Sequence, residues 1–448
     1  LIRDGHKILD IAGKAGEFAL AAYERLKRLG FDDAAVWNSI CTIPTSGITY
    51  EFTRMVYEIL GLNVACLADK FTAYDLLEVK NANRKIDYEK IAALLTQAKP
   101  FNTVTLHDTV AEGDEKVKFD VVVGNPPYQI SDGGAQASAK PIYNNFVAVA
   151  KELAPAYMTM IMPTRWYAGG KGLDDFRNAM LEDATIQELH DFLHPEEVFP
   201  GTNNRGGICY LMWNAQHDNR RSPVTITTHE GEGRTSVSHR NLRFRDMDIF
   251  VRYSKAIEIV SKVVPEGTDT ISNYVSAAKA FGYRTFFIND PNFRESQTGL
   301  SSPVKCYGRA GRVGYVEKDE VPSHTDWICR WKVYVPESNN IGTELNDDNQ
   351  NAFVGEPETI CTETFLVIGA ELELNEASAI NLSNYLKTRF ARFLLSLAKI
   401  SQHGTAKTYR FVPLQDFSKP WTDEALYAKY NLTADEIAFI EATIKPME

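Results

Sequence analysis

The sequence predicts two domains, a doubly wound α/β sheet over residues 1–248 and a separate, mixed α+β domain over residues 249–448. In the first half, short apolar runs alternate with segments whose apolar residues follow the helical period. Such repetition of strand and helix is typical of a parallel sheet with right-handed crossovers. Near residue 251 the alternation gives way to short segments broken by Gly, Pro, Asn and Ser. The length of 448 residues also exceeds what one hydrophobic core usually organises.

The first expected elements are a strand, a glycine turn and a helix. Residues 7–13 (KILDIAG) form a short apolar run that ends in glycine. Residues 17–30 (EFALAAYERLKRLG) have helical spacing and close on a glycine that suits a left-handed cap. A strand over 34–43, a helix over 49–61 and a strand over 63–71 continue the alternation.

The later elements complete the expected sheet. Residues 119–124 (FDVVVG) are a β-branched run, as expected for a strand covered on both faces of a parallel sheet. The expected elements that follow are a helix over 141–154, a strand over 157–163, a helix over 173–181 and the strands 186–192 and 207–213. A glycine-rich loop over 131–140, a long helix over 375–400 and an acidic, helix-rich tail over 422–445 are also expected.

The charge distribution allows a nucleic-acid partner despite a net charge of −11. Phosphate contacts need a local basic surface, not a basic protein. Residues 219–245 and residues 279–313 each contain six basic and two acidic residues. The arginines that we expect to bind DNA are Arg220, Arg221, Arg240, Arg243, Arg245, Arg309 and Arg312.

The composition also indicates the cellular compartment. No run approaches the roughly 18 apolar residues that a membrane span needs, and the N-terminus lacks a secretion signal. The six cysteines lie far apart without a CxxC pair. We therefore expect a cytoplasmic protein with no membrane contact and no bound metal.

The sharpest motif is the run from Asn125 to Tyr128 (NPPY), directly after the apolar run 119–124. Ligands of open α/β sheets gather beyond the carboxyl ends of strands. The Asn125 side chain and the Pro126 carbonyl can each accept an N–H from an aromatic amine and localise its lone pair, while Pro127 stiffens the turn. Tyr128 offers a flat face on which a base can stack. The motif therefore predicts a site that activates an exocyclic amine.

This segment resembles the catalytic motif of amino-group DNA methyltransferases, and asparagine in first place resembles the adenine-N6 branch of Eco57I-type and TaqI-type restriction-modification enzymes. Residues 140–181, 196–213 and 411–441 are also similar to Eco57I-type modification methylases. The resemblance implies a Rossmann-like methyltransferase sheet followed by a target-recognition domain. It also implies S-adenosylmethionine as cofactor, double-stranded DNA as substrate, and extrusion of the target adenine from the helix.

The resemblance extends to a glycine motif in DIAGKAGEF. Asp10, Ala12, Gly16 and Phe18 match the family's cofactor-binding pattern, and Gly13 lies in the same tight turn. Lys14 departs from the pattern, because many members have glycine there.

Two further residues are carried over from the family. Asp108 matches an acid that bonds the adenine moiety of the cofactor, and Phe199 matches a second aromatic that flanks the extruded base in TaqI-like enzymes. A solvated loop aspartate and a plain core phenylalanine are the alternatives. The acid that usually holds the ribose hydroxyls has no counterpart in residues 39–47 (SICTIPTSG).

Other functions remain open. A protein or RNA methyltransferase can use the same NPPY chemistry, and Lys14 with the missing ribose acid would also suit a catalytically inactive DNA-binding or specificity subunit. A restriction endonuclease or a helicase, as a further domain or subunit, is a candidate partner. Methylation at carbon 5 of cytosine is disfavoured, because the chain has no Pro-Cys pair for the nucleophile.

Overall fold

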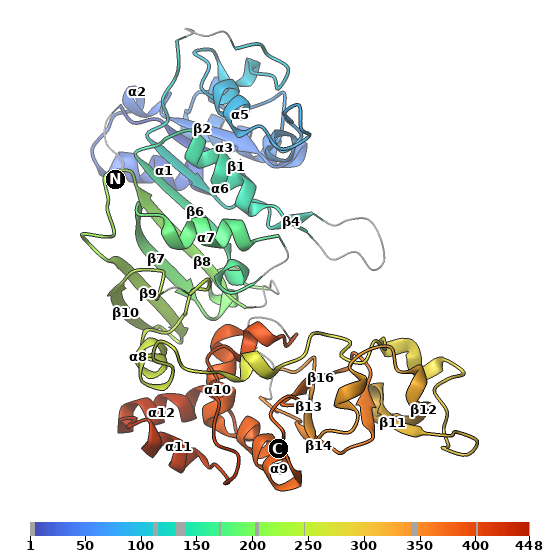
Figure 1. Cartoon of the computed structure of the whole chain (residues 1–448). Coiled ribbons are helices and arrows are strands. Elements are labelled where there is room, and N and C mark those ends of the chain that lie inside the picture. Colours follow the sequence, from blue (N-terminus) through green and yellow to red (C-terminus); the bar gives the residue numbers. More distant parts are fainter. Residues whose placement is uncertain are drawn as a thin grey trace. The chain divides into compact units, whose positions relative to one another are not determined.

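The computed structural model describes residues 5–110, 115–130, 140–169, 172–201, 206–245, 247–341, 348–399 and 402–447. The chain forms two compact units, Leu1–Asp248 (unit 1) and Ile249–Glu448 (unit 2), shown in Figure 1. The assignment of catalysis to unit 1 and of target recognition to unit 2 stays a prediction. The expected glycine-rich loop over 131–140 lies, except for Lys140, outside the described residues.

Unit 1 is built on an eight-stranded sheet of order β10-β9-β7-β8-β6-β3-β1-β2. Its strands are β1 (Ile8–Gly13), β2 (Ile40–Pro44), β3 (Val121–Gly124), β6 (Tyr157–Pro163), β7 (Ile186–Phe192), β8 (Ile208–Asn214), β9 (Val224–Gly231) and β10 (Arg234–Arg240). The adjacent strands β2, β1, β3 and β6 run parallel to one another. Strand β8 is antiparallel to both of its neighbours, β6 and β7, and β10 is antiparallel to β9. The predicted α/β class is therefore confirmed in its coarse form, a large and mostly parallel sheet.

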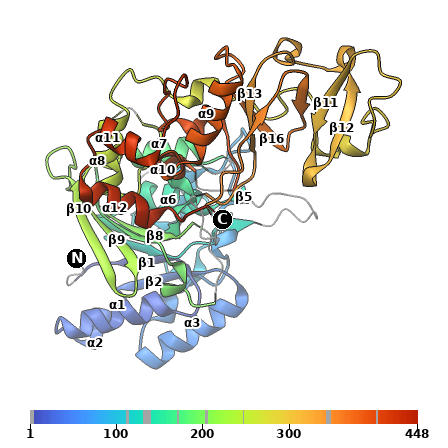
Figure 2. The ribbon, with the colours of Figure 1, turned by 90° about the horizontal axis from the view of Figure 1, so that it is seen from below.

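Helices cover both faces of this sheet. Those of unit 1 are α1 (Glu17–Arg28), α2 (Asp33–Val36), α3 (Gly47–Leu60), α4 (Ala73–Leu76), α5 (Tyr88–Leu95), α6 (Tyr143–Glu152) and α7 (Asp174–Glu182). Figure 1 and Figure 2 show α1 and α3 on one face and α6 and α7 on the other. Because both faces are covered, β1 is apolar throughout except for Asp10, and every residue of it is buried.

Three segments of unit 1 differ from the sequence-based expectation. Residues 34–43, expected as one strand, begin in the short helix α2, and only the part from Ile40 onward joins the sheet as β2. Residues 63–71 form a 3-10 turn (Val64–Cys66) and one parallel bridge from Leu67 to Thr42 instead of a full strand. The arginine-rich residues 219–245 contain the hairpin β9–β10, which was not expected. Strand β10 is largely exposed and polar, so it lacks the apolar alternation that identifies strands.

Unit 2 combines two three-stranded sheets with five helices. The sheets have the orders β12-β11-β15 and β14-β13-β16. Their strands are β11 (Pro303–Tyr307), β12 (Val313–Glu317), β13 (Lys332–Pro336), β14 (Phe353–Gly355), β15 (Thr359–Cys361) and β16 (Phe365–Ile368). The helices are α8 (Ser254–Val263), α9 (Glu376–Lys387), α10 (Arg389–Ala398), α11 (Asp423–Lys429) and α12 (Ala434–Thr443). A single buried cluster that includes Phe281, Phe293 and Tyr334 joins residues of both sheets.

The expected long helix over 375–400 is divided at Thr388, whose backbone (φ −58°, ψ 150°) is extended. Thr388 accepts a hydrogen bond from the Ala391 amide, and Asp423 accepts bonds from the amides of Arg389 and Phe390. These acceptors satisfy the first N–H groups of a new helix, which explains the break. None of the helices in the described ranges combines the length and the apolar character that crossing a bilayer requires.

Candidate active site

The sheet brings the two predicted motifs to the same edge. Strands β1 and β3 are parallel neighbours, with Asp10 opposite Val123. Asn125 therefore emerges beside the turn that follows Asp10, although the two residues are far apart in sequence. Because β2 lies on the other side of β1, the strand order reverses between β1 and β3, which is where open α/β sheets bind ligands.

Close packing explains the glycine that precedes Asn125. A Cβ atom on Gly124 would lie 2.9 Å from Ile11 Cγ2 and 2.9 Å from Met160 Sδ. At Gly13, a Cβ atom would lie 2.4 Å from Thr42 Cγ2. Both strand ends thus depend on glycine to hold their present spacing.

Three polar side-chain atoms near this edge are buried and have no hydrogen-bond partner among the described residues. They are Asn125 Oδ1 and the hydroxyls of Tyr128 and Tyr143. Burial first, and the nearby Cys209 second, raise the pKa of both tyrosines, so both hydroxyls lie near the start of β8. A buried polar group without a partner costs about 1–3 kcal/mol. Such a cluster is explained by a polar ligand that completes these bonds.

Helix α6 and its neighbours hold Tyr128 in place. The Ile142 amide donates to the Tyr128 carbonyl at 3.1 Å, and the short ribbon of β4 (Gln129–Ile130) and β5 (Lys140–Pro141) follows the motif. The Tyr143 ring meets Phe176 edge to face at 5.9 Å. Sequence reasoning missed Tyr143, since a tyrosine in the first turn of a helix is not distinctive by itself.

Strand β1 and the turn after it carry a buried carboxylate and an uncapped helix start. Asp10 is 1% exposed, its Oδ1 accepts from the Ala12 amide at 3.3 Å, and its Oδ2 has no partner among the described residues. Burial raises the pKa of this carboxyl group to about 7. Gly16 has φ 84° and precedes α1, which has no side-chain cap, while Phe18 lies half-buried in its first turn. An orphaned carboxylate and open helix N–H groups fit the ammonium and carboxylate ends of an amino-acid ligand.

Helix α3 braces the same turn from one side. The Thr53 hydroxyl donates to the Lys14 carbonyl at 3.4 Å. Val56 would lie 3.2 Å from a Cβ atom placed on Gly16. Lys14 is exposed, although partial burial lowers the pKa of its ammonium group.

Polar groups that sequence reasoning missed lie at the end of β2. The Thr45 amide donates to the Gly13 carbonyl at 3.0 Å, and Ser46 caps α3. Asp69 follows Leu67 and Ala68, which pair with Thr42 of β2. This acid therefore lies at the same edge, one strand beyond β2. The apolar run before Asp69 was a signal, but its pairing with β2 could not be read from the sequence.

Two predicted residues have other local roles. The Asp108 carboxylate accepts from the Lys99 ammonium, from the Thr105 amide at 2.9 Å and from the Thr105 hydroxyl at 2.7 Å. These bonds, the one from Lys99 first, lower the pKa of Asp108 to about 2. Phe199 follows the 3-10 turn Pro195–Glu197 between β7 and β8, and its amide donates to the Pro195 carbonyl at 2.9 Å. Their roles toward cofactor and base stay predictions.

The predicted DNA-binding arginines differ in exposure. Arg220 and Arg221 lie between β8 and β9 with side chains 76% and 88% exposed. Arg309 and Arg312 lie between β11 and β12 and are exposed as well.

The other three arginines of the prediction make contacts within the chain or are partly buried. Arg243 is 27% exposed and bonds Glu182 and the Met247 carbonyl at 3.0 Å each, which favours a structural role over the expected phosphate contact. Burial lowers the pKa of Arg240, at the end of β10, to about 10. Arg245 lies over the Phe244 ring.

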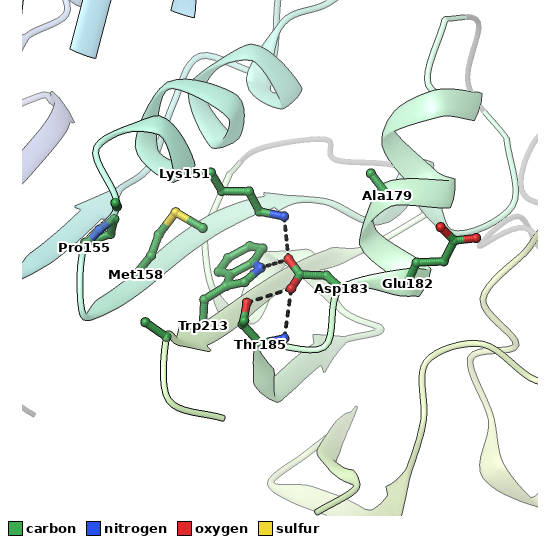
Figure 3. Close-up of a pocket in the computed structure, with 10 residues that line it drawn as sticks. Lys151, Pro155, Met158, Ala179, Glu182, Asp183, Thr185 and Trp213 are labelled. Carbon is green, nitrogen blue, oxygen red and sulfur yellow. Dashed lines mark hydrogen bonds and ion pairs between the residues drawn. The ribbon is translucent and has the colours of Figure 1, made fainter. Parts of the chain in front are cut away.

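A pocket of about 400 Å³ lies at the opposite edge of the sheet (Figure 3). Its wall includes Asp183, whose carboxylate accepts from Lys151, from Trp213 Nε1 at 2.8 Å and from the amide and hydroxyl of Thr185. Although burial acts against it, Lys151 and Thr185 lower the pKa of Asp183. Because Asp183 accepts hydrogen bonds from residues of α6, of β8 and just before β7, we interpret this network as a structural contact that holds α6 and the end of α7 against the sheet.

Residues 48–199 match the family model of the Eco57I restriction-modification methylase. A curated relative, an uncharacterized adenine-specific methylase from Mycoplasma pneumoniae, is 33% identical over 130 residues, which are 28% of this chain and 31% of that relative. The predicted resemblance is therefore confirmed over a segment that contains Asn125 to Tyr128 and excludes Asp10 to Gly16.

Solved structures of restriction-modification proteins are also similar. The methyltransferase subunit of a type I system from Streptococcus thermophilus has a TM-score of 0.31 at 15% identity, over 57% of this chain and 47% of that one. The type IIL enzyme MmeI in complex with DNA has a TM-score of 0.45 at 10% identity, over 98% of this chain and 68% of that one. The chain spans less than half the length of the curated relative and of the type I subunit.

Proposed function

We propose that this chain transfers a methyl group from S-adenosylmethionine to the exocyclic amine of adenine in a specific DNA sequence, as the modification part of a restriction-modification system. The observation that carries the proposal is the buried Asn125 Oδ1, which has no partner among the described residues and emerges next to the Asp10 turn. Helices on both faces and a strand order that reverses between β1 and β3 support a Rossmann-like methyltransferase core.

The chain's own residues would prepare the amine. Asn125 Oδ1 and the Pro126 carbonyl each accept one N–H of the extruded adenine, which pulls the nitrogen toward tetrahedral geometry and localises its lone pair. Tyr128 stacks against the base, and Pro127 keeps the two acceptors aligned. The bound cofactor supplies an electrophilic methyl group on a sulfonium. No covalent enzyme intermediate is needed, so positioning and electrostatics do the catalysis.

The turn after β1 would hold the cofactor. The ionised Asp10 carboxylate pairs with the cofactor's positive charge, and the uncapped start of α1 receives its carboxylate. Thr45, Ser46 and Asp69, at the end of β2, are the candidates for the ribose hydroxyls. These three residues would take the role of the ribose-binding acid that the sequence lacks directly after the second strand.

Double-stranded DNA would be bound by the exposed arginines of both units, with Arg220, Arg221, Arg309 and Arg312 on phosphates or base edges. Because the substrate amine is buried in a duplex, the adenine must rotate out of the stack. A restriction endonuclease or helicase, as a domain or subunit, is the partner that a restriction-modification system would supply.

The test is methyl transfer by Asn125→Ala. We expect transfer of tritiated methyl groups to unmodified genomic DNA to fall at least a thousandfold, while calorimetric affinity for S-adenosylmethionine stays within about threefold of the wild-type value. Asn102→Ala is the matched control, because Asn102 Oδ1 is also buried without a partner among the described residues but lies in the 3-10 turn Phe101–Thr103. Substantial methylation by the Asn125 variant would refute the assignment.

Calorimetry with the wild-type chain separates this proposal from a catalytically inactive DNA-binding subunit. Measurable S-adenosylmethionine binding to the folded chain supports the enzyme. A folded chain that does not bind S-adenosylmethionine supports the inactive subunit. Methylation of protein or RNA but not of DNA would support the third alternative.

A further inference from the structure

Helix α3 presents an apolar stripe on its outward side. Four large side chains on this helix are exposed, Ile48 by 72%, Phe52 by 55%, Met55 by 51% and Ile59 by 79%. Thr53 and Tyr57 of the same helix are completely buried, and they hold its other side against the sheet. Single exposed apolar residues are ordinary, whereas a continuous row of them marks an interaction surface.

The spacing of the stripe fits another helix. The intervals between the four residues are four, three and four positions, which is the alternation of d and a positions in a heptad repeat. A strand or loop would not match this seam. The occupant is therefore an α-helix that packs along α3.

The charges beside the stripe select the kind of helix. Glu51 and Glu58 occupy the g positions next to the seam and are 61% and 52% exposed. Both pair with Arg54, which leaves one net negative charge along this edge. The opposite edge, at the e positions, carries the uncharged Thr49 and Val56. A partner helix with basic residues beside its own seam would complement α3.

Two other occupants fit less well. In an antiparallel pair of two α3 helices, g positions face g positions, so glutamates would oppose glutamates. An anionic lipid surface attracts helices with basic borders, and this border is acidic. We propose that the outward face of α3 binds an amphipathic α-helix of a partner protein whose apolar seam is edged by lysine or arginine.

The test measures binding of labelled synthetic helices to the full chain by fluorescence anisotropy. The probe has three heptads with leucine at a and d and lysine at e and g. One comparison peptide carries glutamate at e and g, and another has the lysine composition in scrambled order. We expect the lysine-edged helix to bind at least tenfold more tightly than either comparison peptide.

Variants of the stripe locate the binding. Phe52→Ser and Ile59→Ser should each weaken binding of the lysine-edged helix at least tenfold. The matched control Val237→Ser, at a residue 59% exposed on β10 of the same unit, should leave it unchanged. The double variant Glu51→Lys and Glu58→Lys should reverse the preference toward the glutamate-edged helix.

Several outcomes would overturn the proposal. One is absent binding, and another is equal binding by the wild-type chain and Phe52→Ser. Self-association that Ile59→Ser abolishes, measured by sedimentation, would make a second copy the occupant. If Phe52→Ser lowered the thermal midpoint well beyond the drop in Val237→Ser, the face would be covered by this chain itself.

Discussion

Within β1, the Asp10 carboxyl group is buried with one of its oxygens unpaired among the described residues. Burial disfavours the charged form, so its pKa rises from 3.8 to about 7. Around neutral pH such a group disfavours the folded state, because the unfolded chain ionises it freely. Its presence is explained if a cationic ligand pairs with the carboxylate.

Cofactor affinity should therefore depend on pH through Asp10. Below about pH 7 the carboxyl group is protonated, and binding of a cation must first remove the proton. We expect the calorimetric affinity for S-adenosylmethionine to rise several-fold from pH 6 to pH 8 and Asp10→Asn to remove this rise. Asp108→Asn is the control, because a group with a pKa of about 2 keeps its charge across this range.

The free chain should show the opposite trend in stability. The folded pKa of Asp10 lies above its unfolded value, so the unfolded state releases this proton first as pH rises. The contribution of Asp10 to the free energy of unfolding is complete below about pH 4 and is lost by about pH 7. A shift of about three pKa units corresponds to roughly 4 kcal/mol. Denaturant titrations of the wild-type chain and of Asp10→Asn at several pH values measure this contribution as the difference between the two. Equal pH profiles for the two would contradict the burial of a titrating group.

Part of the candidate site could be selected from the sequence, and the residues that surround it could not; the roles of all of them stay predictions. Asn125 and Tyr128 could be selected because they follow the apolar run of a strand, and Asp10 because it interrupts such a run ahead of a glycine turn. Tyr143 and Asp69 reach the same region only through the β4–β5 ribbon and the bridge from Leu67 to Thr42. Such long-range pairing leaves no local pattern in the sequence.

At the scale of the elements, β3 is closely packed at its end. It lies between β1 and β6, and Gly124 fills the narrow space between Ile11 and Met160. An added methyl group must displace the Ile11 or Met160 side chain or shift the strand end that carries Asn125. Overpacking of this kind typically costs about 1–3 kcal/mol.

Gly124→Ala should therefore lower both stability and methyl transfer. We expect a loss of about 1–3 kcal/mol in the free energy of unfolding and at least a tenfold loss in transfer rate. Gly47→Ala, at the start of α3, is the control, since nothing lies within 4 Å of its added Cβ. That change should be neutral or slightly stabilising. Wild-type activity in Gly124→Ala would mean that the Asn125 position tolerates movement of β3.

Elements were predictable where burial is continuous or periodic. The expected strands 7–13, 119–124 and 157–163 correspond to β1, β3 and β6, whose residues pack on covered faces. The break at Thr388 could not be predicted, because Asp423 supplies the acceptors from a distant segment. The hairpin β9–β10 was missed because its outer strand is polar.

At the scale of the whole molecule, the proposed function requires an acidic protein to bind an acidic polymer. With a net charge of −11, attraction must come from local groups of exposed arginines. Arg220 in unit 1 and Arg312 in unit 2 are 76% and 45% exposed, although each pairs with an acid on the surface. Such surface pairs contribute little and are readily exchanged for phosphate.

Salt dependence of DNA binding should identify the arginines that reach phosphate. Each lost contact should reduce the slope of log affinity against log salt by about 0.9. We expect Arg220→Ala and Arg312→Ala each to do so. Arg28→Ala should leave the slope unchanged, because that side chain is equally exposed, at 75%, but lies on α1 outside both basic stretches.

Arg243→Ala gives the second comparison. This guanidinium bonds Glu182 and the Met247 carbonyl, so its removal should lower the free energy of unfolding by about 1 kcal/mol. The salt slope should stay that of the wild-type chain. A reduced slope for Arg28→Ala, or unchanged slopes for both Arg220→Ala and Arg312→Ala, would place the DNA on another surface.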